Sequence, residues 1–156
     1  MRKLRVSLTD KCNLRCHYCM PIDSSFMNED KYLEPHLYHT VVKELCDYGL
    51  EELRITGGEP LLRKSFPEIV RGFKNLPLKK IGLTTNAVLL NRFADLLQEC
   101  HIHYLNISLD SLKSESFRQI TQGNKFHDVM RNIELSKQMG FDVKVNVVAM
   151  RGVNDH

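Results

Sequence analysis

The chain has 156 residues, of which 42% are hydrophobic and 26% are charged, values typical of one soluble globular domain. Its formal net charge of +3 is too small to argue for nucleic-acid binding. It contains no run of about 18 apolar residues and no apolar signal-peptide core near its start. Composition therefore excludes disordered, fibrous and membrane-spanning proteins, and we expect a cytoplasmic location.

Strand-like runs alternate with amphipathic, helix-like runs along the whole chain. In chain order we predict strand 4–9, helix 37–48, strand 53–56, helix 66–73, strand 80–86, helix 91–99, strand 104–110, helix 126–138 and strand 143–150. This repetition favours parallel βαβ units. Nothing in the composition marks a second domain, so residues 1–156 are predicted to form one domain.

Each predicted strand alternates an apolar residue with a polar or charged one. Because successive side chains of a strand point to opposite faces, the helices would cover the apolar face and leave a polar one. The polar set includes Arg5, Arg54, Thr84, Asn106, Ser108 and Lys144. This pattern favours an α/β fold, a partial TIM-like (β/α) barrel of about five parallel strands holding a polar ligand at their carboxyl ends. An open sheet with one solvated face is the alternative.

Three of the five cysteines lie together directly after the first predicted strand. Cys12, Cys16 and Cys19 have C-x3-C-x2-C spacing, which is a poor disulfide framework and a better metal or redox site. The other two, Cys46 and Cys100, lie in apolar patterns and are predicted to be buried structural thiols.

Two kinds of metal centre fit three clustered thiolates. A structural zinc ion needs a fourth ligand, which His36 or His39 could supply. A [4Fe–4S] cluster held by three cysteines leaves one iron free to bind a further ligand. An open iron in a polar barrel is an arrangement suited to catalysis.

Two motifs resemble those of the radical S-adenosyl-L-methionine (SAM) superfamily: C-x3-C-x-Tyr-C, with Tyr18 before the last cysteine, and Gly57-Gly58-Glu59-Pro60. Longer segments resemble the GTP 3′,8-cyclase branch, the molybdenum cofactor biosynthesis protein A family. These are residues 4–21, 54–63, 83–86, 106–110 and 143–155, so the resemblance covers essentially the whole chain.

The resemblance implies a role for particular residues. The [4Fe–4S] cluster would be held by Cys12, Cys16 and Cys19. SAM would be bound by Tyr18, Gly57, Gly58, Glu59 and Ser108. The substrate GTP would be bound by Arg5, Arg54, Thr84 and Lys144.

The implied activity is that of a radical SAM lyase, in which reductive cleavage of SAM yields a 5′-deoxyadenosyl radical that starts cyclisation of GTP. The resemblance also implies an electron donor such as a flavodoxin-type reductant, and allows a homodimer. The resemblance also implies further barrel strands and a second cluster domain, which we expect to lie outside these 156 residues. A different radical SAM enzyme, such as a peptide maturase or an activase, and an inactive metal-binding fragment remain as alternatives.

Overall fold

A computed structural model describes residues 2–21 and 23–155 of the chain. Its five strands form one parallel sheet in the order β1-β2-β3-β4-β5. The strands are β1 Lys3–Ser7, β2 Glu52–Thr56, β3 Lys80–Thr85, β4 Tyr104–Ser108 and β5 Asp142–Asn146. The α-helices are α1 Pro35–Asp47, α2 Phe66–Phe73, α3 Ala94–Glu99, α4 Ser114–Thr121 and α5 Phe126–Gln138. Short 3-10 helices are η1 Glu29–Lys31, η2 Pro60–Leu62 and η3 Leu90–Arg92.

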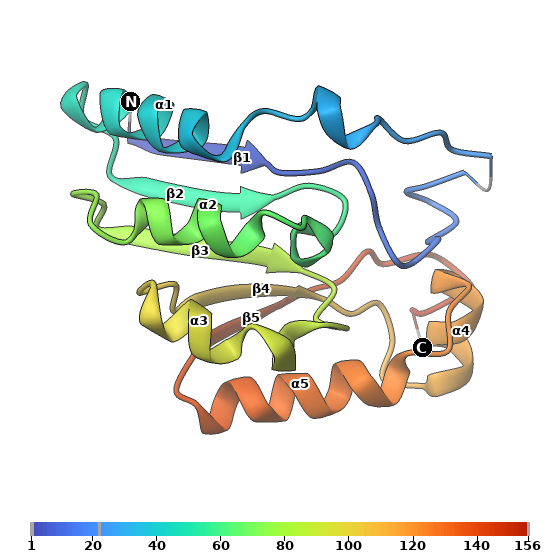
Figure 1. Cartoon of the computed structure of the whole chain (residues 1–156). Coiled ribbons are helices and arrows are strands. Elements are labelled where there is room, and N and C mark those ends of the chain that lie inside the picture. The colour runs from blue at the N-terminus through green and yellow to red at the C-terminus, as the bar shows by residue number, and fades with distance from the viewer. Residues whose placement is uncertain (1, 22, 156) are drawn as a thin grey trace.

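The helices lie against the sheet in the way that parallel βαβ units require (Figure 1). The sheet is an open, curved layer, and β1 and β5 form its two edges in the described chain. The long segment after β1 runs beyond the carboxyl ends of the strands, toward α4 (Figure 1). This end of the sheet is where β/α barrels place their ligands.

The core is built from the apolar positions of the central strands. Ile55, Leu83 and Ile107 are fully buried, as are Phe66 and Phe73 on α2. Burial of each such side chain contributes about 1.5–3 kcal/mol. The alternate positions Arg54, Thr84, Asn106 and Ser108 are half-buried on the other face, so the predicted division into an apolar and a polar face is confirmed for the central strands.

The last strand departs from that prediction. Predicted to extend over 143–150, it ends at Asn146, and Val145 is 43% exposed although its position belongs to the apolar set. The strand lies at the sheet edge in the described chain. The N–H of Val148 donates to Asp110 Oδ1 at 2.9 Å, so a side-chain acceptor replaces the strand ladder there.

Two helical segments also differ from the prediction. Helix α4 was not predicted, because its short sequence is rich in Ser and Thr and carries only two large apolar residues, Phe117 and Ile120. The predicted helix 91–99 is divided into η3 and α3 at Phe93, whose ring packs edge-on against Phe66 with centroids 5.3 Å apart. No helix in the described ranges is long and apolar enough to cross a membrane.

Of the two cysteines predicted to be structural, Cys100 is fully buried in the core, which confirms its prediction. Cys46 is only half-buried on α1, so its predicted burial is correct in part.

Candidate functional site

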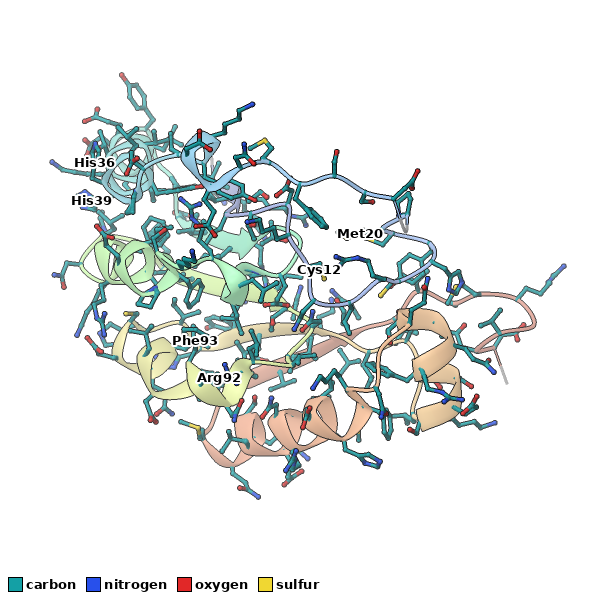
Figure 2. The ribbon with its side chains drawn as sticks, turned by 45° about the vertical axis from the view of Figure 1, so that its right-hand side comes forward. Cys12, Met20, His36, His39, Arg92 and Phe93 are labelled. Atoms are coloured by element: carbon teal, nitrogen blue, oxygen red, sulfur yellow. The ribbon has the colours of Figure 1, made fainter. Side chains whose placement is uncertain are left out.

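The three clustered cysteines border one cavity at the carboxyl ends of the strands. The cavity has a volume of about 110 Å³, and its lining includes Cys12, Cys16, Cys19, Tyr18, Gly58, Thr84, Ser108 and Asp110. Cys12 lies on the loop that passes over this end of the sheet (Figure 2). Three residues predicted as SAM contacts, Tyr18, Gly58 and Ser108, are therefore brought together with the cysteines.

The cysteine loop packs directly on the backbone that leaves β2. The N–H of Gly58 donates to Thr9 O and that of Glu59 to Lys11 O, both at 2.7 Å. A Cβ added at Gly58 would lie 2.4 Å from Lys11 O. Only glycine allows this approach, so the glycine pair fixes the entrance of the cysteine loop against the end of the second strand.

The side chain of Glu59, predicted as a SAM contact, does not line the cavity. It is fully buried, and its carboxylate accepts hydrogen bonds from Leu61 N, from Thr85 Oγ1 at 2.8 Å and from Asn86 N at 2.7 Å. Gly57 likewise packs against Thr9 and is absent from the lining. Glu59 therefore supports the turn after β3.

Burial raises the pKa of Glu59 from an ordinary 4.5 to about 7. The stability linked to this shift is fully present below pH 4.5. It is lost between pH 4.5 and about 7, where the unfolded chain has released the proton and the folded chain still holds it, and the loss is complete once the folded chain deprotonates as well. We expect the free energy of unfolding to fall by on the order of 3 kcal/mol across this window. Denaturant titrations at several pH values between about 5 and 8 give the free energy of unfolding at each pH, and this free energy should fall less with rising pH in Glu59→Gln than in the unaltered chain. The same pH dependence in Glu59→Gln and in the unaltered chain would contradict the raised pKa of Glu59.

The sulfur atoms of the cysteine loop are suited to a cationic centre. Cys12 Sγ accepts hydrogen bonds from Leu14 N at 3.5 Å and from Asn86 Nδ2 at 3.7 Å. Burial raises the pKa of the Cys12 thiol, and raises that of Cys16 to about 11. A bound metal would shift the equilibrium between thiol and thiolate toward the thiolates, which are the metal-binding form.

A single zinc ion fits the structure less well than a cluster. Within residues 2–21 and 23–155, no three His, Cys, Asp or Glu side chains are gathered as one metal ion requires. His36 and His39, either of which could supply the fourth ligand in the zinc alternative, lie on α1 well away from Cys12 (Figure 2). Sulfurs that surround a cavity suit a [4Fe–4S] cluster, whose thiolates bind different irons.

Asp110 connects this loop to the segment after β5. Its Oδ2 accepts a hydrogen bond of 2.7 Å from Tyr18 Oη, and its Oδ1 accepts the N–H of Val148. Burial and the adjacent carboxylate raise the pKa of Tyr18, which keeps its hydroxyl a donor. The sequence offered no signal for this pair beyond the polar end of the fourth predicted strand, because the partners are 92 positions apart.

Cationic side chains line the polar face of the sheet. A groove of about 300 Å³ is bordered by Arg5, Arg54 and Lys80, and an adjoining one of about 220 Å³ by Arg54, Lys80 and Lys144. Three predicted GTP contacts therefore share one surface. Thr84 is separate, since it lines the cysteine cavity. Lys80 begins β3, as the predicted strand 80–86 has it, and its Nζ lies 3.6 Å from the ring centroid of Tyr104.

Arg54 lies across the sheet because Gly82 leaves it room. A Cβ at Gly82 would come within 2.9 Å of Arg54 Cζ. In the part of the chain that the structure describes, Arg54 Nη1 is buried without a hydrogen-bond partner. An unpaired buried guanidinium nitrogen is costly, and Arg54 also borders both grooves, where an anionic ligand would meet its positive charge.

Clustered thiols and a glycine pair at the carboxyl ends of parallel strands, together with a cationic groove on the polar sheet face, define a cofactor-binding β/α enzyme domain. Residues 6–156 match the Radical SAM superfamily, and the chain belongs to this superfamily.

Several relatives carry a more specific name. The chain is 54% identical over 155 residues to a GTP 3′,8-cyclase of Synechocystis sp., and the match covers 99% of this chain and 47% of that protein. A GTP 3′,8-cyclase of Listeria monocytogenes is 41% identical, with 97% and 46% covered. Molybdenum cofactor biosynthesis protein 1 of Drosophila melanogaster is 41% identical, with 97% and 27% covered. The chain thus spans at most about half the length of these curated relatives.

Solved structures share the fold. Streptococcus suis SuiB bound to S-adenosylmethionine superposes with a TM-score of 0.82 at 18% identity, covering 96% of this chain and 34% of that one. Native anSMEcpe with bound AdoMet gives a TM-score of 0.69 at 21% identity, covering 92% and 42%. These likenesses confirm the predicted partial β/α barrel, which is open in the described residues.

Proposed function

We propose that this chain holds a [4Fe–4S] cluster through Cys12, Cys16 and Cys19, binds SAM beside it, and provides the barrel part of a GTP 3′,8-cyclase. That enzyme is a radical SAM lyase which converts GTP to 3′,8-cyclo-7,8-dihydroguanosine triphosphate in molybdenum cofactor biosynthesis. Membership of the superfamily supports the cofactors. The 54% identity to the Synechocystis GTP 3′,8-cyclase supports the reaction.

The residues around the cavity fit these two cofactors. Three sulfurs supply the ligands of three irons, and the described cavity leaves space beside them. When bound, the reduced cluster supplies the electron that cleaves a carbon–sulfur bond of SAM, and a flavodoxin-type reductant would provide that electron. The backbone of Gly58 leaves room for the methionyl end of SAM, while Tyr18 and Ser108 offer a ring and a hydroxyl to its nucleoside.

The observation that carries GTP as substrate is the position of Arg54. Its guanidinium lies on the polar face of the sheet with a buried, unpaired nitrogen, and Arg5 and Lys144 add positive charge on either side. A guanidinium presents paired donors that match phosphate oxygens, and lysine adds a point charge. A triphosphate on this face would meet all three cations. Glu52 and Asp142 also border the grooves, and Glu52 is paired with Lys3 at 3.1 Å.

We expect Arg54→Gln to weaken GTP binding roughly tenfold to a hundredfold, because it removes a charged hydrogen-bond donor. Anaerobic equilibrium dialysis with radiolabelled GTP measures this loss. The matched control is Arg71→Gln, an exposed arginine of α2 paired with Glu99 at 3.7 Å, which should bind GTP as the unaltered chain does.

Equal binding by the Arg54→Gln variant and the unaltered chain would contradict this assignment. Binding of a peptide in place of GTP would favour a peptide-modifying radical SAM enzyme instead.

A further inference from the structure

We propose that Asn86 is a positioning residue that donates a hydrogen bond to Cys12 Sγ and thereby raises the reduction potential of the cluster bound there. This inference rests on the proposed cluster site. It deepens that proposal by naming a residue that sets how readily the cluster accepts an electron.

The side-chain amide of Asn86 serves two acceptors on the cysteine loop. Its Nδ2 lies 3.7 Å from Cys12 Sγ and 2.7 Å from Asn13 Oδ1. An amide nitrogen carries two hydrogens, so both contacts can be made at once. Asn86 follows β3 and is separated from Cys12 by 74 positions, so the contact joins two distant segments at the cavity wall.

The orientation of this amide is fixed by a backbone donor. Asn86 Oδ1 accepts the N–H of Val88 at 3.0 Å. A backbone N–H can only donate, so the oxygen must face Val88 and the nitrogen must face the sulfur. The side chain is 8% exposed, which leaves it little freedom to turn away.

Buried polar groups hold the turn that carries Asn86. The N–H of Asn86 donates to Glu59 Oε2 at 2.7 Å. The next residue, Ala87, has a left-handed φ of 62°, and its carbonyl accepts Asn132 Nδ2 at 2.6 Å. A left-handed alanine is unfavourable, so the surrounding bonds must define this turn. Glu59 and Asn132 are both buried and do not line the cavity, and their hydrogen bonds to the backbone of this turn hold the side-chain amide of Asn86 in position.

Hydrogen bonds to cluster sulfurs are among the factors that set the potential of an iron–sulfur centre. Reduction adds negative charge that is shared with the ligating sulfurs, so a donor stabilises the reduced state more than the oxidised state. The N–H of Leu14 also reaches Cys12 Sγ, at 3.5 Å. Loss of the Asn86 donor should therefore lower the potential without removing a ligand.

The test is an EPR-monitored redox titration of the reconstituted full chain with Asn86→Asp and Asn86→Ser. Aspartate keeps the shape but places an acceptor against the sulfur, and serine removes the donor. We expect the equilibrium constant for reduction to fall roughly tenfold, a downward shift of about 59 mV for a one-electron couple. The matched control, Asn91→Asp, makes the same change at an exposed position of η3 and should leave the potential unchanged.

A second measurement needs no variant to fold. In the unaltered chain labelled with ¹⁵N only at the side-chain amides of asparagine, pulsed EPR should detect a coupling between the reduced cluster and the amide nitrogen that donates to Cys12 Sγ. Variants that load iron with unchanged potential, or a labelled chain without such a coupling, would overturn the role of Asn86 and leave the cluster site standing. Failure of the unaltered chain to load iron would overturn the proposed function as well.

Discussion

The Gly58→Ala variant is expected to lose SAM binding by at least about a hundredfold and to be less stable by roughly 2–3 kcal/mol. The added Cβ would lie 2.4 Å from Lys11 O and 2.7 Å from Asp10 O, both backbone atoms that cannot rotate away. The entrance of the cysteine loop would have to move, and the cavity wall at Gly58 would move with it. SAM-induced change in the EPR spectrum and denaturant unfolding measure the two effects.

A second Gly→Ala substitution separates this steric effect from the general effect of adding a methyl group. Gly72 lies within α2, and a Cβ there would meet only the side chain of His39, at 3.4 Å. Gly72→Ala should therefore be neutral, or stabilising by up to about 1 kcal/mol because alanine favours a helix. Normal SAM binding by Gly58→Ala would show that the close backbone approach does not shape the site.

The Cys16→Ser variant is expected to lose nearly all of the iron that the unaltered chain binds, about four atoms per cluster. Cys16 borders the cavity together with Cys12 and Cys19, and a serine hydroxyl is a far poorer ligand for iron than a thiolate. Iron and acid-labile sulfide are counted after anaerobic reconstitution, with circular dichroism to verify that the variant is folded.

The matched control for this loss is Cys46→Ser. Cys46 is a half-buried free cysteine on α1, outside the lining of the cysteine cavity, and its substitution should leave the iron content unchanged. Equal iron loss in both variants would indicate nonspecific binding to thiols. Full iron retention in Cys16→Ser would remove Cys16 from the proposed ligands.

Local patterns predicted most of what positions the site. Alternation along β2, β3 and β4 assigned Arg54, Thr84 and Ser108 to the polar face, since a strand's side chains change face at every residue. The cysteine motif and the glycine pair located the cavity for a different reason: each follows a strand, and the carboxyl ends of parallel strands meet at one edge of the sheet. The edge strand β5 was predicted less well, because Val145 has no covering layer in the described chain.

Contacts between distant segments could not be predicted in this way. The pairing of Tyr18 with Asp110, and that of Asn86 with Cys12, join residues 92 and 74 positions apart. Their geometry depends on how the loops after three different strands pack. Glu59 shows the same limit: its place in a motif suggested a ligand contact, whereas its fully buried carboxylate supports the turn after β3.

The central claim is that the three cysteines hold a cluster with an open iron to which SAM binds. The most direct test is anaerobic reconstitution of the full chain with iron and sulfide, followed by iron counting and EPR of the reduced protein with and without SAM. We predict about four irons per chain and a spectrum that changes when SAM is added. Bound zinc, or a cluster spectrum that is indifferent to SAM, would contradict the account.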